Sequence, residues 1–237
     1  AAFLKAPAET IIANIQGTDM LLRYALEKKT QRFLFVSSGE VYGEGDEKIT
    51  EFFEEYSGYI DILNPRSCYP LSKRTTENLC ISYTAQFGID TIIARPCHTY
   101  GPNSTSSDNR ATVQFANNAL KNEDIILKSE GAQMRSYCYI ADCVSALLTV
   151  LIKGKSRQAY NLANPGSRIT ISEFARITAD QVGRKVVFQI PNSIDLRQRT
   201  PITRAVLSSR KLEALGWHGH FDAQTGIQHM LRIMQEL

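Results

Sequence analysis

Short apolar runs alternate with longer amphipathic stretches in the first half of the chain. Residues 33–36 form an uninterrupted apolar run between Arg32 and Ser37, which predicts a buried strand. Residues 90–94 are rich in β-branched side chains and predict a second one. The stretch between these strands, residues 66–87, has helical character. Because buried strands that alternate with helices form parallel sheets, the pattern predicts an α/β protein.

Other amphipathic stretches predict the elements around this sheet. Residues 7–29 begin with Pro7, which favours a helix N-terminus, and they repeat apolar residues at helical spacing. Shorter patterns predict helices at 112–120, 141–152 and 223–236, and strands at 125–127 and 159–163. The stretch that starts at Thr170, with Ser172 and polar surroundings, predicts the capped start of a further helix.

Polar residues follow the first predicted strand directly, in the order Ser37, Ser38, Gly39, Glu40. Ligands of open parallel sheets bind where the strands end, so these side chains are candidates for a site. The next helix places Tyr69 and Lys73 one turn apart on one face. A hydroxyl, a phenol and an ammonium group are therefore expected to converge.

The same Tyr-x-x-x-Lys spacing occurs at Tyr24 and Lys28. No strand that ends in serines precedes this second pair at a suitable distance. We therefore interpret Tyr24 and Lys28 as part of an exposed helix face.

The order of strand, serines, tyrosine and lysine resembles the extended short-chain dehydrogenase/reductase family of nucleotide-sugar epimerases, dehydratases and decarboxylases. The resemblance covers nearly the whole chain and includes the stretches 14–18, 95–102, 135–142 and 209–217. It implies an α/β fold: a doubly wound parallel sheet, Rossmann-like and N-terminally incomplete, with a smaller C-terminal substrate-binding domain. Residues 1–97 would be the remainder of the NAD-binding domain, with 158–180 returning to it, and 98–237 would mainly bind substrate. In the 14–18 stretch, the small Gly17 would allow close helix packing.

The resemblance also implies roles for individual residues, with NAD as cofactor and a nucleotide-diphosphate sugar as substrate. The catalytic residues would be Ser38, Glu40, Tyr69 and Lys73. The cofactor would contact Ala1, Ala2, Ser37, Tyr69, Lys73 and Pro96. The substrate would contact Ser38, His98, Arg135 and Arg199. His98 stands where the family has an asparagine, Arg135 matches the arginine that reaches the diphosphate, and Arg199 is chosen over its neighbours Arg197 and Arg204.

The glycine-rich turn that holds the NAD pyrophosphate in this family, and the acidic residue that holds the ribose, have no counterpart in the chain. Their place would be before residue 1. We therefore expect a first mononucleotide-binding half of roughly 80 residues to precede this sequence in the full enzyme. The chain alone is expected to bind NAD poorly.

The implied chemistry begins with oxidation of the sugar at C4. Tyr69 would accept the hydroxyl proton, Ser38 would orient the oxygen, and Lys73 would lower the pKa of the phenol and hold the nicotinamide ribose. Glu40 favours decarboxylase or 4,6-dehydratase-like chemistry after the 4-keto intermediate, whereas Gly39 stands where the dehydratases carry their acid. A 4-epimerase stays open as an alternative, since Pro70 and Leu71 resemble epimerases. A non-catalytic NAD or nucleotide-sugar sensor is the alternative of another class.

Composition narrows the remaining possibilities. The net charge of +3 is spread along the chain, and no run of 18 apolar residues occurs, so neither nucleic acid nor a membrane is an expected partner. The five cysteines are odd in number and form no Cys-x-x-Cys, which argues against a disulfide framework and a metal site and favours a reducing cytoplasm. We expect a homodimer in which the helix at 7–29 and the Tyr69 helix pair with their symmetry mates. Its apolar contacts are predicted at Leu22, Ala25, Leu79 and Tyr83.

Overall fold

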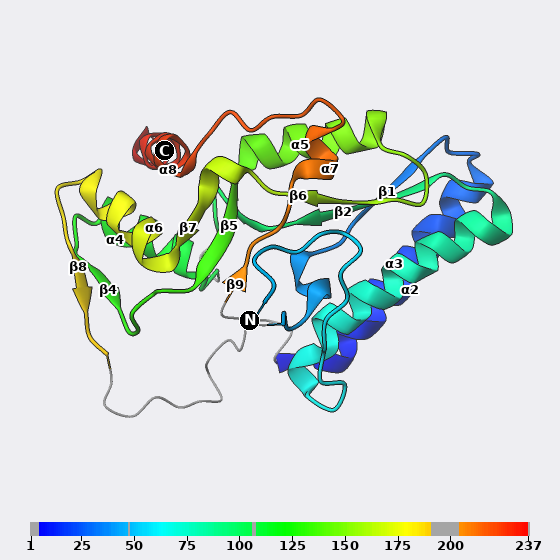
Figure 1. Cartoon of the computed structure of the whole chain (residues 1–237), viewed down its shortest axis with the longest axis horizontal. Coiled ribbons are helices and arrows are strands. Elements are labelled where there is room, and N and C mark those ends of the chain that lie inside the picture. Colours follow the sequence, from blue (N-terminus) through cyan, green and yellow to red (C-terminus); the bar gives the residue numbers. More distant parts are fainter. Residues whose placement is uncertain (1–4, 47, 106–107, 191–203, 237) are drawn as a thin grey trace. The chain divides into compact units, whose positions relative to one another are not determined.

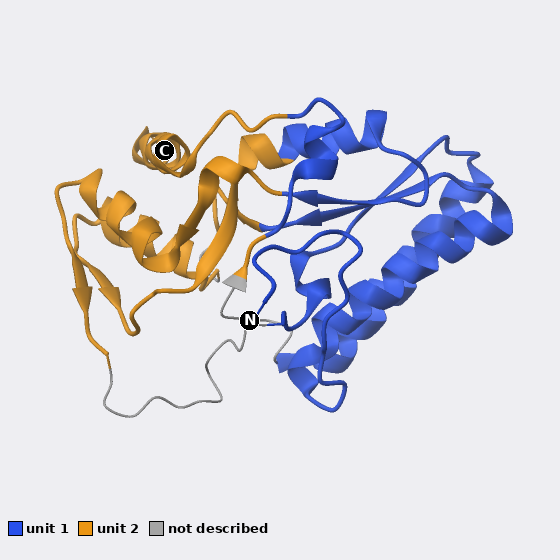
Figure 2. Cartoon of the chain, in the orientation of Figure 1, with its two compact units in different colours: residues 1–97, 144–162, 207–217 blue, residues 98–143, 163–206, 218–237 orange. Residues whose placement is uncertain are grey.

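The computed structural model describes residues 5–46, 48–105, 108–190 and 204–236. The chain divides into two compact units (Figure 2). Unit 1 comprises residues 1–97, 144–162 and 207–217, and unit 2 comprises residues 98–143, 163–206 and 218–237. Residues 163–180, expected with the first domain, thus lie in unit 2. Ala1, Ala2, Arg197 and Arg199 lie outside the described residues.

Unit 1 is built on a parallel sheet in the order β1-β2-β6 (Figure 1). The strands are β1 (Phe33–Val36), β2 (Thr91–Pro96) and β6 (Ala159–Leu162). The other elements are α2 (Pro7–Glu27), η1 (Gly39–Tyr42), η2 (Pro65–Ser67), α3 (Cys68–Phe87), most of α5 (Ile140–Lys153) and α7 (Arg210–Glu213). In Figure 1, α2 and α3 lie on one side of the sheet and α5 on the other. The predicted doubly wound α/β arrangement is confirmed.

The helices α2 and α3 pack against each other and against β1. Their shared core contains Leu22, Ala25, Phe35, Cys80 and Tyr83, with Leu79 packed at its margin. Leu22, Ala25 and Tyr83, predicted to pair with a symmetry mate, are therefore buried inside unit 1, and their assignment is wrong. The assignment of the partly buried Leu79 stays a prediction. Packing within one chain and packing against a second copy both need an apolar helix face, so the sequence could not distinguish the two kinds of contact.

The expected close packing at Gly17 is also wrong. Apart from its chain neighbours and the backbone of its own helix, a Cβ added there would meet no atom of the described residues within 4 Å. The link between α2 and α3 in this region is polar: the Asn14 amide donates to the Ser72 hydroxyl at 3.2 Å.

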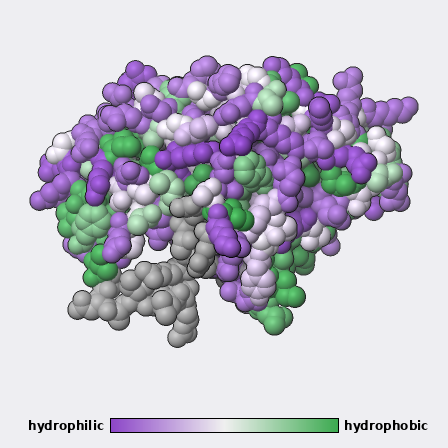
Figure 3. Space-filling model, in the orientation of Figure 1, coloured by the Kyte–Doolittle hydropathy of each residue, from purple (hydrophilic) through white to green (hydrophobic). Residues whose placement is uncertain are grey.

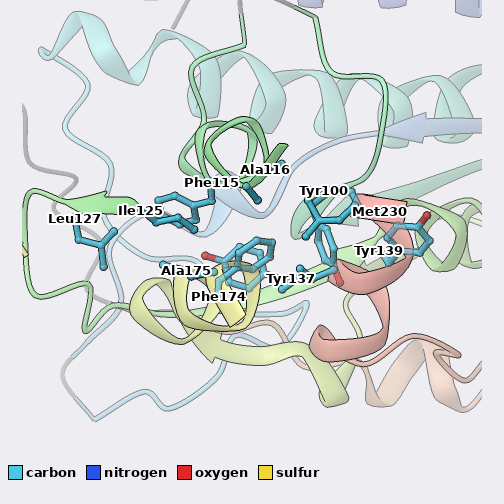
Figure 4. Close-up of a cluster of buried hydrophobic side chains, with 14 residues drawn as sticks. Tyr100, Phe115, Ala116, Ile125, Leu127, Tyr137, Tyr139, Phe174, Ala175 and Met230 are labelled. Carbon is cyan, nitrogen blue, oxygen red and sulfur yellow. The ribbon is translucent and has the colours of Figure 1, made fainter. Parts of the chain in front are cut away.

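Unit 2 holds a mixed sheet in the order β3-β5-β7, in which β9 also pairs with β5, and a separate parallel pair of β4 and β8. The strands are β3 (His98–Tyr100), β4 (Ile125–Leu127), β5 (Met134–Tyr139), β7 (Arg168–Thr170), β8 (Val186–Phe188) and β9 (Arg204–Ala205). The other elements are α4 (Ala111–Leu120), η3 (Pro165–Ser167), α6 (Ile171–Asp180), α8 (Ala223–Glu236) and the first turn of α5. Figure 4 shows their aromatic core, in which Phe174 of α6 meets Tyr100 of β3 and Tyr137 of β5.

Polar contacts fix the ends of these elements. The N-cap of α6 is Thr170, at the start of the predicted stretch, and Thr170 forms a capping box with Glu173. The buried Asp142 carboxylate accepts hydrogen bonds from the backbone N–H groups of His220 and Phe221. Trp217 is buried and donates to Ser145, as expected of a core residue. Within the described ranges, no helix is long and apolar enough to cross a membrane.

Candidate active site

The carboxyl end of β1 delivers two serines to one edge of the unit 1 sheet. The backbone of Ser37 still pairs with β2, through its N–H to the Ala94 carbonyl at 2.7 Å. Ser38 leaves the sheet and becomes the N-cap of η1, where its hydroxyl accepts from the Glu40 N–H at 3.2 Å. The turn ends at Gly43, whose φ of 66° favours glycine and whose Cβ would collide with the Tyr59 carbonyl.

The start of α3 places Tyr69 beside this serine. Asn64 caps η2 by accepting from the Arg66 N–H at 3.0 Å, and α3 follows with Tyr69 in its first turn. The phenol of Tyr69 shares a hydrogen bond with the side chain of Ser38. The hydroxyl and the phenol thus converge, as the spacing along the sequence predicts.

One turn along α3, the ammonium group of Lys73 reaches back to β1. Its Nζ donates to the Val36 carbonyl at 3.0 Å and lies 4.8 Å from the Phe35 ring centroid and 5.8 Å from that of Tyr69. Ser38, Glu40, Tyr69 and Lys73 therefore gather at one end of β1, within unit 1.

Burial dominates the electrostatics of this cluster. Desolvation raises the pKa of Tyr69 above its ordinary value, the Ser38 hydrogen bond lowers it, and the charge of Glu40 raises it. Desolvation lowers the pKa of Lys73, against the charge of Glu77, which raises it. Desolvation also raises the pKa of Glu40, against the charge of Arg66, which lowers it. The pKa of Tyr69 is thus raised, because desolvation outweighs the Ser38 hydrogen bond. The lowering of this pKa by Lys73 stays a prediction.

Two observations bear on what this edge can hold. The Ser37 hydroxyl is buried without a hydrogen-bond partner among the described residues, so a donor or acceptor from a bound molecule would satisfy it. Pro96, at the end of the neighbouring strand β2, is half-buried. These residues and Lys73 fit the polar edge of a cofactor, whereas the described residues contain no cluster of His, Cys, Asp or Glu that could hold a metal ion.

Gly39 lies close to the side chain of Leu207. A Cβ on Gly39 would lie 3.1 Å from the Leu207 side chain and 3.4 Å from the Pro96 carbonyl. A side chain at this position would need the Leu207 side chain to shift by a few tenths of an ångström. The acid expected of a dehydratase at this position is missing from the sequence.

The substrate candidates His98 and Arg135 lie in unit 2, on neighbouring strands. His98 pairs with Tyr137 in the parallel register of β3 and β5, and Arg135 precedes Tyr137 by two positions on the same face. Desolvation, with the charges of Arg135 and Arg110, lowers the pKa of His98 to about 4, although the residue keeps an exposed surface. Arg135 is buried, and desolvation lowers its pKa too. Of the alternatives to Arg199, only Arg204 is described, in β9 opposite Met134.

One residue close to the catalytic candidates was not singled out from the sequence. Arg95, directly before Pro96, forms an ion pair with Glu77 of α3, one turn beyond Lys73. It also contacts the Tyr42 hydroxyl of η1. The signal in the sequence was an arginine at the end of an otherwise apolar strand.

Comparison with known proteins shows the family of the chain. The model of the NAD dependent epimerase/dehydratase family matches residues 1–163. The chain belongs to this family. The match includes β1, η1, α3 and β2, which carry or flank the catalytic candidates of unit 1.

Similar family members are UDP-glucuronic acid decarboxylases. UDP-glucuronic acid decarboxylase 5 of Arabidopsis thaliana is 34% identical over 227 residues, which are 94% of this chain and 63% of the relative. UDP-glucuronic acid decarboxylase 1 of Xenopus tropicalis is 30% identical over 236 residues, 99% of this chain and 54% of the relative. The chain thus spans less than two thirds of the length of these relatives.

Solved structures of other family enzymes share the fold. UDP-glucose 4-epimerase of Thermotoga maritima, solved with UDP-glucose, has a TM-score of 0.82 at 22% identity and covers 100% of this chain and 74% of its own. The dTDP-glucose 4,6-dehydratase DesIV of Streptomyces venezuelae, solved with NAD and TYD, has a TM-score of 0.82 at 24% identity, covering 99% and 69%. At these identities the likeness establishes the fold.

Proposed function

We propose that the chain carries the catalytic part of an NAD-dependent enzyme that decarboxylates a UDP-linked hexuronate through a 4-keto intermediate. The observation that carries this proposal is the Ser38–Tyr69 hydrogen bond, with Lys73 one turn along α3. The printed activity of the similar decarboxylases supports the choice of substrate.

The first step is oxidation of the sugar at C4. Tyr69 accepts the proton of the C4 hydroxyl, and Ser38, which already shares a hydrogen bond with the phenol, orients the oxygen. When bound, NAD would supply the hydride acceptor, and its positively charged ring would favour the phenolate form of Tyr69. Ser37, Tyr69, Lys73 and Pro96 are the described residues that would hold this cofactor, and Lys73 would hold its nicotinamide ribose.

The second step is loss of the carboxyl group. A ketone at C4 lets the C5–C6 bond break, because the electron pair moves into the ketone as carbon dioxide leaves. Protonation at C5 by a proton from solvent, and return of the hydride to C4 with the proton from Tyr69 to the C4 oxygen, would complete the cycle. No acid is needed at position 39, where this chain has Gly39. Glu40 lies beside Tyr69 and would face the sugar at C5.

Substrate binding would also use unit 2. The buried guanidinium of Arg135 is suited to the diphosphate, since a planar fork binds phosphate oxygens in pairs. The neutral ring of His98 would contact the sugar nucleotide as a hydrogen-bonding group.

We also propose that the chain forms a homodimer through α2 and α3, with other residues than those first expected. The exposed apolar side chains of α2 are Ile11, Ile12, Met20, Leu21 and Tyr24. Hydrophobic surface, green in Figure 3, occurs at the lower right in the region of α2, α3 and the loop before α3. Such exposed apolar residues are typical of an interface.

The proposed function is tested by product analysis with a panel of substrates. The full-length protein is purified and incubated with NAD and UDP-glucuronate, UDP-glucose or dTDP-glucose, and nucleotide sugars are separated by chromatography. The proposal requires a UDP-pentose and carbon dioxide from UDP-glucuronate, with no net reduction of NAD. A 4-keto-6-deoxy sugar would indicate a dehydratase, an inverted C4 hydroxyl an epimerase, and binding without any product a sensor; each would overturn the proposal.

A further inference from the structure

The guanidinium group of Arg95 forms hydrogen bonds to three residues near the catalytic cluster, and the proposed mechanism gives Arg95 no role. Its Nε donates to Glu77 Oε1 at 2.9 Å and its Nη2 to Glu77 Oε2 at 2.7 Å, so the pair is bidentate. The side chains are only 12% and 10% exposed. Its Nη1 donates to the Tyr42 hydroxyl at 2.9 Å and to the Glu54 carbonyl at 2.8 Å.

These partners belong to the segments that carry the catalytic candidates. Glu77 lies on α3, one turn after Lys73 and two turns after Tyr69. Tyr42 closes η1, the short helix that Ser38 caps and that contains Glu40. Arg95 itself ends β2 next to Pro96. One guanidinium therefore joins α3 and η1 across the end of β2.

The contacts beyond Arg95 make this joint rigid. The Tyr42 hydroxyl donates to Asn161 Oδ1 at 2.6 Å, and the Tyr42 ring stacks on Phe52 with centroids 5.1 Å apart. The Asn161 backbone N–H in turn donates to the Glu54 carboxylate at 2.8 Å. Tyr42 and Asn161 are buried, so these hydrogen bonds lie in surroundings of low dielectric constant, where they are stronger than at the surface.

The Arg95–Glu77 pair also balances charge beside Lys73. The carboxylate of Glu77 acts on the Lys73 ammonium, one turn away on the same helix. Arg95 holds a positive charge in direct contact with this carboxylate. Removing either partner alone would leave the other charge buried and uncompensated near Lys73 and Tyr69.

We infer that Arg95 is a positioning residue for the proposed reaction: it fixes α3 and η1 in the arrangement that brings Tyr69, Lys73 and Glu40 together, and it compensates the charge of Glu77. This inference rests on the proposed function for its effect on turnover. Its electrostatic part can be tested without turnover.

The other charges near the cluster come from four elements. Glu40 lies on η1, Arg66 on η2, Arg74 on α3 and Glu54 in the loop before η2. Arg74 donates hydrogen bonds to the Val41 and Gly58 carbonyls, whereas the Glu77 carboxylate accepts its hydrogen bonds from Arg95. All four stay unchanged when Glu77 or Arg95 is substituted.

The test uses opposite changes in charge at one ion pair. Glu77→Gln leaves Arg95 uncompensated, so the added positive potential should move the Tyr69 limb of the kcat/KM profile to lower pH by about one unit. Arg95→Met leaves Glu77 uncompensated and should move this limb to higher pH by about the same amount. Arg95→Lys retains the charge but loses the fork, so kcat should fall about tenfold or more while the limb stays in place.

Matched controls come from the other end of the same two strands. Arg32 and Asp90, directly before β1 and β2, form an ion pair at 2.7 Å. The variants Arg32→Met and Asp90→Asn each remove one partner of this ion pair, as the test variants do for Arg95 and Glu77. They should leave the pH of the Tyr69 limb in the kcat/KM profile unchanged. Near-ultraviolet circular dichroism compares the fold of all five variants with the wild type.

A second readout is the titration of tyrosine ¹³Cζ resonances, with the Tyr69 signal assigned by its loss in Tyr69→Phe. Opposite displacements in Glu77→Gln and Arg95→Met support the inference, whether or not the wild type turns over. Displacements in the same direction, or none, overturn it. If Arg95→Met fails to fold, a displacement to lower pH in Glu77→Gln together with a lower kcat and an unmoved Tyr69 limb in Arg95→Lys supports the inference, and no displacement in Glu77→Gln overturns it. Absence of turnover in the wild type would instead count against the proposed function.

Discussion

The side chain of Ser38, at the end of β1, shares a hydrogen bond with the phenol of Tyr69, in the first turn of α3. The strand and the helix are separated in sequence by a loop and two short turns, yet their polar groups meet at one edge of the sheet. A sugar hydroxyl bound there can exchange its proton with the phenol while the serine holds its oxygen. This relationship underlies the predictions for catalysis.

Tyr69→Phe removes the proton acceptor of the first oxidation and retains the ring. We expect turnover of UDP-glucuronate to fall at least about a hundredfold, with little change in nucleotide-sugar affinity. Carbon dioxide release and isothermal titration calorimetry measure the two quantities. Tyr24→Phe, at the second Tyr-x-x-x-Lys pair, is the control and should leave turnover intact. Retained turnover in Tyr69→Phe would exclude the phenol as the proton acceptor.

Glu40→Gln distinguishes the reactions that can follow the 4-keto intermediate. In a decarboxylase the ketone accepts the electron pair, so carbon dioxide release should fall less than about tenfold. In a dehydratase or a 5-epimerase, the same variant should stop exchange of the C5 hydrogen with solvent deuterium. In a 4-epimerase it should have almost no effect. Unchanged activity in Glu40→Gln would remove Glu40 from the catalytic set.

The proposed dimer can be disrupted at its exposed apolar side chains. Leu21 of α2 is 54% exposed, and Leu21→Glu places a charge among the apolar residues of this helix. We expect multi-angle light scattering to show a dimer for the wild type and a monomer for the variant at micromolar concentration. Gln16→Glu adds the same charge at an exposed polar position of α2 and should stay dimeric. A monomeric wild type would contradict the proposal.

The capping box of α6 predicts a pH-dependent contribution to stability. Hydrogen bonds from the backbone and side chain of Thr170 lower the pKa of Glu173 below its ordinary value of 4.5. The stabilisation by ionised Glu173 is therefore fully present above pH 4.5 and is lost as the pH falls through the lowered pKa. Thr170→Ala should reduce the free energy of unfolding by about 1 kcal/mol at pH 7.

Urea denaturation at pH 7 and pH 3 measures this effect. The difference between wild type and Thr170→Ala should shrink at the lower pH. Thr225→Ala, near the start of α8, should show the same trend, because the Thr225 hydroxyl donates to Asp222 and its hydrogen bonds lower the pKa of that carboxyl. A difference for Thr170→Ala that is equal at both pH values would show that the carboxylate adds nothing to the cap.

The sequence predicted those parts of the fold that a strong local pattern specifies. Four apolar residues mark β1 and helical spacing marks α3, and the structure has these elements with nearly the predicted bounds. The strand β5 was not predicted, because its sequence mixes Arg135 and Ser136 with aromatic residues and shows no alternation, although most of the strand is buried. Very short strands such as β7 and β9 depend on their pairing with β5, which local sequence does not encode.

The catalytic candidates could be predicted because a family motif keeps them close together in sequence. Arg95, Glu77 and Tyr42 could not, because each lies in a different element and their meeting depends on tertiary packing. The same reason explains the error over Leu22 and Tyr83: an apolar helix face does not say whether its partner is another helix of the same chain or a second copy.

The central claim, oxidation at C4 followed by return of the same hydride, is tested most directly with UDP-glucuronate deuterated at C4. Mass spectrometry and NMR of the product measure where the deuterium lies after complete turnover with NAD that contains no deuterium. The account predicts that the pentose product keeps deuterium at C4, with no net reduction of NAD. Loss of the deuterium to released NADH, or decarboxylation by the Tyr69→Phe variant, would contradict it.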